Sequence, residues 1–358
     1  MAFLMKKRIK HIVYLFLFYS GLLSAFLMVF TKLKKRHAAV ILIYHQIVDG
    51  DSRSYLHKGA AIHHQLKDFR AEMEFVRKWF RVISLDDVLS ALRTETGFKK
   101  PSLAITFDDG YRDNYTLAYP VLRKLNVPAT IYLTTGLIGT FKRTWVDDIE
   151  YALLRARVDE FTMPALFGNR ALAIRTLKQK EAVNVRIGEA LKRVSNARKS
   201  ELMAELFARL EVDPTLDDNR TRRMLSWEEV REMSQNGISF AAHTSSHPIL
   251  TQVPLDVART EIFESKQKME AELGKPVKHF AFPNGRHNDF SRELRDYCVS
   301  LGFETIATAE YGAVSRDSNP HYLLRLIPVI PLPHFAIELT RLFVFGRNYA
   351  KWREYDRG

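Results

Sequence analysis

Cysteine is almost absent from this sequence, because Cys298 is the only one in 358 residues. A lone thiol cannot form an internal disulfide, so the cysteine count is compatible with either side of a membrane. Internal repeats, low-complexity tracts and a folded basic motif for nucleic acid are also missing, so we expect neither a repeat array nor a nucleic-acid-binding protein. What is present is a chain that is 46% hydrophobic and long enough for one large barrel or two modest domains.

Acidic residues are missing from the amino-terminal end. The first 36 residues contain eight lysines and arginines and no aspartate or glutamate, so they supply most of the formal net charge of +13. Basic residues beside an apolar stretch favour contact with anionic lipid headgroups over nucleic acid. We therefore expect residues 1–36 to form a basic-flanked membrane anchor.

The apolar run from Ile12 to Thr31 is twenty residues long, which predicts a single transmembrane helix of about 30 Å. A cleaved signal peptide or a buried soluble helix is the alternative, although a signal peptide would have a shorter apolar region. Basic residues flank the run on both sides, so the positive-inside rule does not orient it. A short amino terminus that stays in the cytoplasm would place the remaining chain on the extracytoplasmic side of the cytoplasmic membrane.

Two adjacent carboxylates, Asp108 and Asp109, follow the apolar run Ser102 to Phe107 and are followed at once by Gly110. This pattern predicts a buried strand that breaks into a loop at the acids. Strand ends are where α/β enzymes hold reactive groups. Turn or capping roles for the two acids remain the alternative.

A spaced histidine pair, His243 and His247, follows a second apolar run, Ile238 to Ala242. Their i, i+4 spacing puts both imidazoles on one side if the segment turns helically, and Pro248 limits such a turn to a short one. Parallel strands end on the same side of a sheet, so we expect the histidines to lie near the acids and to form a hydrolytic metal site. Solvated or capping histidines are the alternative.

At these positions the chain resembles the polysaccharide deacetylases of the NodB-homology type, also called carbohydrate esterase family 4. The family's first motif resembles Thr106-Phe107-Asp108-Asp109-Gly110, its second resembles His243 and His247, and its third resembles Phe282-Pro283-Asn284-Gly285. The resemblance spans roughly residues 38 to 330, with an unlike stretch in the middle. It implies an α/β fold, namely a distorted (β/α) barrel.

The resemblance also implies a division of roles within the site. Asp109, His243 and His247 would hold a divalent metal ion, often zinc, and Asp108 would be the general base. Three protein ligands leave a position for water, whose pKa zinc lowers from about 16 towards 7. The expected activity is removal of N-acetyl groups from an amino-sugar glycan. A deformylase or O-acetyl esterase acting on a lipid-linked sugar, and a non-catalytic glycan-binding barrel, are the alternatives.

Two histidines compete for the role of the catalytic acid that protonates the leaving amine. His45 follows the apolar run Ala38 to Tyr44, which predicts a strand buried on both faces. That strand resembles the family's last strand moved to the front, as in the circularly permuted exopolysaccharide deacetylases. His334 lies in a Leu-Pro-His sequence that fits the family pattern, but nearby prolines disfavour a central strand there. We favour His45, with a packed core histidine as the alternative.

The chain departs from the family pattern in its third and fourth motifs. Family members carry an arginine where this chain has Ala281, and Arg286 or Arg325 could reach the same carboxylate from elsewhere. The Asp-Trp pair of the fourth motif is not evident near Asp317. The acidic cluster that begins at Trp145 is expected to start a helix and to line or cap the site rather than to bind metal.

The expected organisation is therefore an anchor, one barrel and two attachments. The barrel covers residues 37–335 and contains a helical insertion at about 151–222, which could cover the mouth of the site. The last segment, 336–358, mixes aromatic and basic residues and is expected to lie at a membrane interface or to pack on the barrel as a terminal helix.

Overall fold

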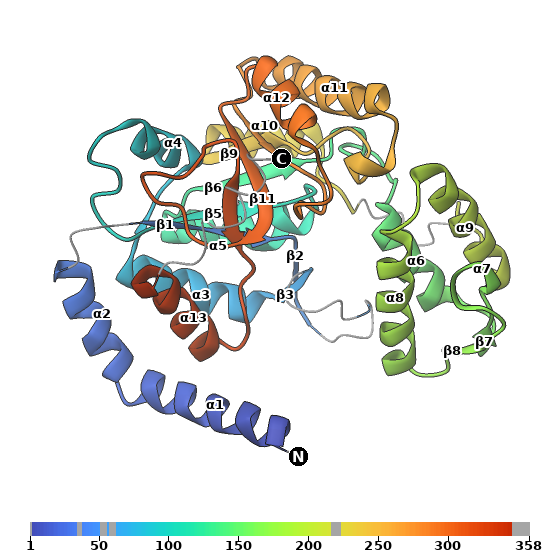
Figure 1. Ribbon diagram of the computed structural model, residues 1–358, viewed down its shortest axis with the longest axis horizontal. Helices are drawn as coiled ribbons and strands as arrows, with labels where there is room; N and C mark the ends of the chain where they lie inside the picture. Colours follow the sequence, from blue (N-terminus) through green and yellow to red (C-terminus); the bar gives the residue numbers. More distant parts are fainter. Residues whose placement is uncertain (1, 34–37, 51–55, 57–61, 216–222, 346–358) are drawn as a thin grey trace.

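A closed barrel of seven parallel strands forms the centre of the molecule (Figure 1). The computed structural model describes residues 2–33, 38–50, 56, 62–215 and 223–345. The barrel strands are β1 (Ala39–Tyr44), β5 (Ser102–Phe107), β6 (Ala129–Leu133), β9 (Ile238–Ala242), β10 (His279–Ala281), β11 (Thr305–Tyr311) and β12 (Leu323–Leu326). Their order around the ring is β1-β12-β11-β10-β9-β6-β5, and β5 pairs with β1 to close it. The predicted barrel is confirmed.

β1 closes the ring although it is the first strand in the sequence. It pairs in parallel with β5 from Ala39 opposite Ser102 to Tyr44 opposite Phe107, and with β12 on its other side. All six of its residues are buried, as expected for a strand covered on both faces. The strands predicted at Ser102–Phe107 and Ile238–Ala242 have those bounds in the structure.

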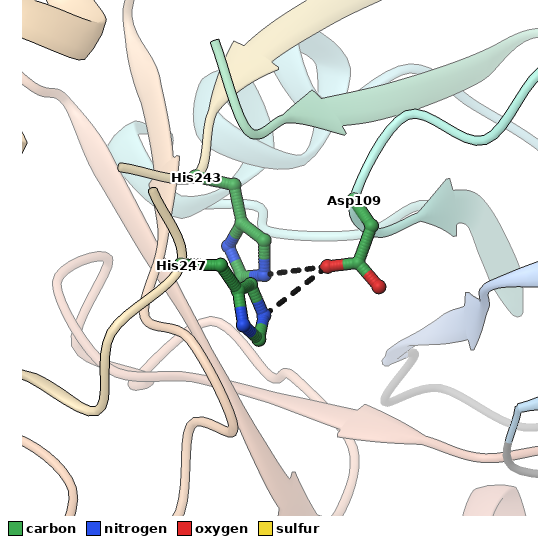
Figure 2. Close-up of side chains that lie close together, drawn as sticks. All are labelled: Asp109, His243 and His247. Carbon is green, nitrogen blue, oxygen red and sulfur yellow. Dashed lines mark ion pairs between the residues drawn. The ribbon is translucent and has the colours of Figure 1, made fainter. Parts of the chain in front are cut away.

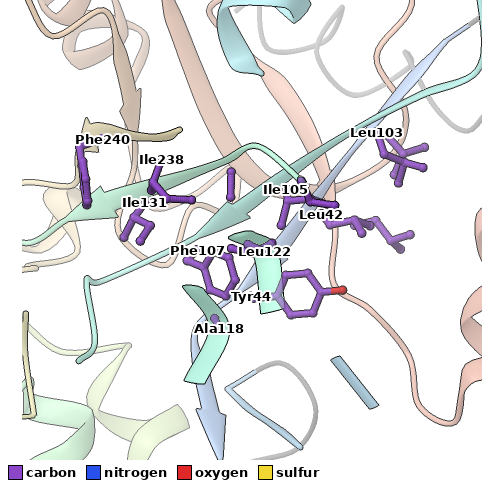
Figure 3. Packing of buried hydrophobic residues seen from close by; sticks show 14 of the residues in the cluster. Leu42, Tyr44, Leu103, Ile105, Phe107, Ala118, Leu122, Ile131, Ile238 and Phe240 are labelled. Carbon is purple, nitrogen blue, oxygen red and sulfur yellow. The ribbon is translucent and has the colours of Figure 1, made fainter. Parts of the chain in front are cut away.

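Helices cover the outside of the barrel, and their apolar faces pack on the strands. They are α3 (Leu66–Trp79), α4 (Leu85–Arg93), α5 (Tyr119–Leu125), α10 (Trp227–Gln235), α11 (Leu255–Leu273), α12 (Arg292–Ser300) and α13 (Leu332–Phe345). Figure 3 shows Ile105 and Phe107 of β5 in one cluster with Leu122 of α5. Their neighbour Ala104 belongs instead to a second cluster, so successive residues of β5 pack in different parts of the core.

Short elements complete the barrel region. β4 (Arg81–Val82) pairs with β5 outside the ring. β2 (Gln46–Val48) follows β1 in the sequence and pairs with β3 (His63–Gln65). A π-helical turn, Asn114–Ala118, precedes α5, and a 3₁₀ turn, Leu250–Gln252, precedes α11.

The predicted helical insertion lies beside the barrel and has its own core (Figure 1). It contains α6 (Trp145–Arg155), β7 (Glu160–Phe161), α7 (Pro164–Phe167), β8 (Leu172–Ala173), α8 (Leu177–Leu191) and α9 (Asn196–Arg209). The residues predicted to pack, Leu191, Leu202, Leu206 and Leu210, are buried in one hydrophobic cluster. Its helical part begins at Trp145, before the boundary expected from the sequence, and residues 216–222 lie outside the described residues.

The amino-terminal apolar run is a bent pair of helices and not one helix. α1 (Ala2–Tyr19) and α2 (Leu22–Leu33) are separated by a break at which Gly21 has a φ of 81°, a left-handed conformation that ends a helix. No single described helix is long and apolar enough to cross a bilayer, whereas the pair passes that test together across a bend of 67°. The prediction of one transmembrane helix over Ile12–Thr31 is therefore not confirmed.

The amino-terminal pair packs on the barrel's outer helices. α1 contacts α13, and α2 contacts α3, where Leu23 and Leu27 are buried. α13 begins at Leu332, so His334 lies in the first turn of a helix and not at a strand end. Leu342 and Phe343 of α13 pack in the main core, while residues 346–358 of the predicted aromatic and basic segment lie outside the described residues.

Candidate active site

Asp109, His243 and His247 meet at one end of the barrel (Figure 2). Asp109 follows β5 and the two histidines follow β9, and β6 lies between these strands. The Asp109 Oδ1 atom is 3.5 Å from His243 Nε2 and 3.2 Å from His247 Nε2. One ligand atom from each residue lies within 4.8 Å of the other two. The structure thus brings together the three side chains that the sequence placed after two separate strands.

The histidines converge through an irregular loop and not through the helical turn expected from their spacing. Thr244 and His247 have φ values of 65° and 64°, so the chain cannot continue as a right-handed helix. Asp109, with a φ of 74°, has the same left-handed conformation. Backbone strain of this kind at non-glycine residues is typical of functional sites, where the surrounding structure holds a required side-chain direction.

Gly110 allows the tight turn that aims Asp109 at the histidines. Its φ is 85°, and an added Cβ would lie 2.6 Å from Leu133 Cδ2 of the adjacent strand β6. A larger residue would therefore be strained by its backbone and would collide with the barrel wall.

The three side chains fit a divalent cation. At bond lengths of about 2.0–2.1 Å, ligands of a tetrahedral ion lie about 3.3 Å apart, close to the two distances from Asp109. The buried Asp109 Oδ1 atom has no hydrogen-bond partner among the described residues, as expected of an atom that binds a metal ion. His243 Nδ1 lies 2.7 Å from Ala281 O, so its proton is held there and the Nε2 lone pair faces Asp109. One carboxylate and two imidazoles form a donor set that suits zinc.

The electrostatics of the site favour the protonation states that metal ligands need. Burial of the His243 ring lowers its pKa to about 4, so this imidazole is neutral. Burial raises the pKa of Asp109, but the nearby His247 outweighs it and the pKa is lowered overall. For His247 burial lowers the pKa, and the charge of Asp109 raises it above its usual value. Asp109 is thus an anion facing a neutral imidazole and a basic one.

Asp108 is held by an arginine from β12, which lies two strands from β5 in the ring, on the other side of β1. Arg325 of β12 donates to both carboxylate oxygens, at 2.7 Å from Nη1 and 2.8 Å from Nη2, and its Nε donates to Thr308 O at 2.7 Å. Both side chains are almost fully buried. Burial raises the pKa of Asp108, but the charge and hydrogen bonds of Arg325 together with the nearby rings of His243 and His45 outweigh it, so the pKa is lowered and the carboxyl is ionised.

This contact takes the place of the arginine that family members carry at the position of Ala281. Of the two candidates, Arg325 binds Asp108, while Arg286 lies on the wall of the cavity in front of the site. The signal that could have distinguished Arg325 is its place between Leu324 and Leu326 in a buried strand, where a charged residue needs a partner.

A cavity of about 290 Å³ opens in front of the three converging residues. His45, Asp108, Asp109, His243 and His247 all line it. The Nδ1 atom of His45 is buried without a hydrogen-bond partner among the described residues. His334 lies outside this cavity on α13, with its Nε2 atom 2.8 Å from His11 Nδ1 of α1. The structure therefore brings His45 to the site and leaves His334 elsewhere.

The loop after β5 is tied to the start of the insertion by a buried acid of the cluster that begins at Trp145. Asp147 of α6 accepts hydrogen bonds from Tyr111 Oη at 3.0 Å and from Thr144 Oγ1 at 2.9 Å, and Gln46 Nε2 approaches it at 3.4 Å. The helix predicted from Trp145 does begin there, with Thr144 as its cap, and Trp145 lines the cavity.

Comparison with known proteins agrees with this geometry. A family model described as "Polysaccharide deacetylase" matches residues 95–306. YxkH of Bacillus subtilis (strain 168), a protein named as a polysaccharide deacetylase, is 23% identical over 299 residues, which cover 82% of this chain and 73% of that protein.

Two solved structures share the fold at low sequence identity. The Streptococcus pyogenes deacetylase PplD, solved in complex with acetate, has a TM-score of 0.56 at 20% identity, over 85% of this chain and 98% of that chain. IcaB from Ammonifex degensii has a TM-score of 0.53 at 14% identity, over 85% of this chain and 96% of that chain. The barrel and the arrangement of its strands are thus shared by proteins of widely different sequence.

Proposed function

The chain belongs to the polysaccharide deacetylase family, and on this basis we propose that it is a metal-dependent hydrolase that removes N-acetyl groups from an amino-sugar glycan. The observation that carries the proposal is the convergence of Asp109, His243 and His247 beside a second carboxylate, Asp108, that Arg325 holds ionised. A carboxylate bound to a metal is locked as an anion, so only its neighbour is free to accept a proton.

Asp109 Oδ1 and the Nε2 atoms of His243 and His247 would hold the divalent ion, for which zinc is the best match. Such an ion, when bound, lowers the pKa of water towards 7 and polarises a carbonyl oxygen. Ala281 O supports this role because it fixes the tautomer of His243.

Asp108 is proposed as the general base that accepts a proton from the attacking water. The two hydrogen bonds from Arg325 fix the direction of its carboxylate, and its lowered pKa keeps it in the form that can accept a proton. His45, on the wall formed by the end of β1, is proposed as the acid that donates a proton to the leaving amine. Its buried Nδ1 atom has no hydrogen-bond partner in the described part of the chain, so the ring is not committed to a structural contact there.

Release of acetate is the test of this function. We expect the purified protein to release acetate from N-acetylated glycans, to lose that activity in chelator and to recover it on addition of zinc. Acetate release that does not respond to chelator would contradict the metal mechanism. Release of formate, or of acetate only from O-acetylated sugars, would replace the proposed substrate with one of the two related ones.

We also propose that the amino-terminal helix pair attaches the protein to the cytoplasmic membrane, with the barrel on the extracytoplasmic side. Support comes from the basic charge of the first 36 residues and from the exposed apolar side chains of α1 and α2, namely Ile9, Ile12, Val13, Phe16, Tyr19, Leu22, Phe26, Met28 and Val29. Protease added to intact spheroplasts should digest the barrel. Protection of the barrel until the membrane is permeabilised would contradict this orientation.

A further inference from the structure

The cavity in front of the site has a second wall that the proposed chemistry does not use. This wall belongs to the insertion, where Asn184, Gly188 and Lys192 follow one another along one side of α8 and its end, four residues apart. Trp145 and Ile149 of α6 line the same cavity. Figure 1 shows α6 and α8 on the side of the insertion nearest the barrel.

Gly188 is an unexpected residue at the centre of this wall. Inside a helix glycine costs about 0.5–1 kcal/mol relative to alanine. Its backbone does not need glycine, because Gly188 is not among the residues with positive φ, and an added Cβ would meet no atom within 4 Å. Neither backbone geometry nor packing within the protein therefore accounts for it. Its effect is to keep space open along the cavity wall.

Asn184, one turn before Gly188, is 5% exposed and lines the cavity, and its side chain makes no hydrogen bond within the described part of the chain. The side chain offers two donors and one acceptor to whatever enters the cavity. Trp145 has a matching feature, because its buried indole Nε1 donor also has no partner among the described residues.

The charges of the wall indicate the chemistry of its ligand. Lys192 Nζ forms an ion pair at 2.9 Å with Glu189 Oε1, so this cation is already neutralised on its own helix. An amide and open space beside a helix, next to the indole of Trp145, suit the hydroxyl and acetamido groups of a sugar ring.

We propose that Asn184, Gly188 and Trp145 form a subsite for a sugar residue adjoining the one that is deacetylated. This inference rests on the proposed function and adds to it that contacts from the insertion make longer oligosaccharides better substrates than a monosaccharide. The barrel carries the reacting groups, and the insertion binds the neighbouring residue of the glycan.

The test compares Gly188→Leu, which fills the open space, with Ala182→Leu, which adds the same side chain at a position of α8 outside the cavity. The probes are β-linked N-acetylglucosamine mono- to pentasaccharides. Acetate release gives kcat/KM for the full chain, and calorimetry in an Asp108→Asn background gives the affinity without turnover. Metal content and hydrolysis of 4-methylumbelliferyl acetate report on the barrel alone.

Gly188→Leu should lose about tenfold or more in affinity and kcat/KM for the pentasaccharide, a difference of about 1.4 kcal/mol, while the monosaccharide is unaffected. Asn184→Ala should lose about 2–10-fold, the value of one or two hydrogen bonds. Ala182→Leu should match the wild type, and all variants should keep their metal and their esterase activity.

Wild-type affinity of Gly188→Leu for the pentasaccharide, or equal losses for the mono- and pentasaccharide, would overturn the subsite. Failure of every oligosaccharide to bind the Asp108→Asn protein would overturn it as well. Pentasaccharide binding that Gly188→Leu abolishes, combined with no acetate release by the metal-loaded wild type, would support the subsite and overturn the deacetylase proposal.

Discussion

The barrel and the helical insertion have separate hydrophobic clusters and place their polar groups differently. The barrel buries the charged pair Asp108 and Arg325 and the imidazole of His243. Left-handed backbone angles at Asp109, Thr244 and His247 shape the loops that bring the metal-site side chains together. The insertion packs aliphatic and aromatic side chains into a separate cluster and presents polar groups at its edge, where it meets the cavity. The proposed reactive groups and the proposed substrate contacts therefore lie in separately packed parts, so a substitution in one part should leave the other part's function intact.

Removing a metal ligand from the barrel should have the largest effect and tests this separation most strongly. His243→Ala should release the metal and reduce acetate release by roughly 1,000-fold or more, since metal stabilisation of a transition state amounts to several kcal/mol. Metal analysis beside the acetate assay measures both effects. His334→Ala, outside the site, is the control, and full metal content in His243→Ala would show that this ligand is wrongly assigned.

Asp108→Asn should keep the metal and lose about 10²–10⁴-fold in rate, because the amide cannot accept the proton. Asparagine still offers one oxygen to Arg325, so the fold should persist. Turnover of the metal-loaded variant is compared with that of wild type at equal metal content. Loss of metal together with rate would mean that Asp108 is a ligand and not a base.

His45→Ala should lower the rate by about 100-fold, whereas His334→Ala should leave turnover unchanged, since only His45 lines the cavity. The loss should be smaller for substrates whose leaving group needs no proton, such as an activated acetyl ester. If His334→Ala lost more activity than His45→Ala, His334 of α13 would be the catalytic acid.

A core truncation in each part tests directly whether the two parts are independent. Leu206→Ala in the insertion should destabilise it by about 2–5 kcal/mol and weaken oligosaccharide binding while metal content is retained. Leu122→Ala under the barrel strands should destabilise the barrel by a similar amount and lower metal retention on heating. Measuring the metal that stays bound during thermal unfolding distinguishes the two variants. Equal loss of metal in both variants would show one cooperative unit.

The smallest effect concerns Asp113, which accepts hydrogen bonds from Ile47 N and Asn114 Nδ2 at 2.9 Å. Burial raises the pKa of this carboxyl to about 8, so between about pH 4 and 8 the folded chain holds a proton that the unfolded chain has lost. Wild-type stability should therefore fall with pH in this window relative to Asp113→Asn, by less than the limit of about 1.4 kcal/mol per pH unit because Asp113 is only half-buried.

Urea unfolding of both proteins at several pH values measures this difference. The two stability curves should coincide below pH 4, where both side chains are neutral, and separate towards pH 8. Parallel curves across the whole range would show that Asp113 is ionised in the fold.

Much of the barrel and the identity of the converging residues could be predicted from local sequence. Strands β1, β5 and β9 are continuous apolar runs because both of their faces are covered, and each run ends at a residue that lines the cavity. The start of α6 at Trp145 was predictable for a similar reason, since acidic residues in a first turn favour a helix amino terminus.

What could not be predicted depends on contacts between distant residues or on single backbone angles. The Asp108–Arg325 pair joins positions 217 residues apart, and only closure of the ring makes them neighbours. The spacing of His243 and His247 is helical, but left-handed angles at Thr244 and His247 bring the rings together by another path. Gly21 likewise breaks an apolar run that sequence composition describes as continuous.

The position of β1 in the ring has a consequence for biosynthesis. Residues 39–44 leave the ribosome before any other barrel strand, and one of their two hydrogen-bonding partners, β12, lies near the end of the sequence. Until translation reaches residues 323–326, the nascent sheet keeps unpaired edges, which are prone to pairing with other chains. A truncated product that ends before β12 should therefore aggregate in the cell instead of accumulating as a smaller folded protein.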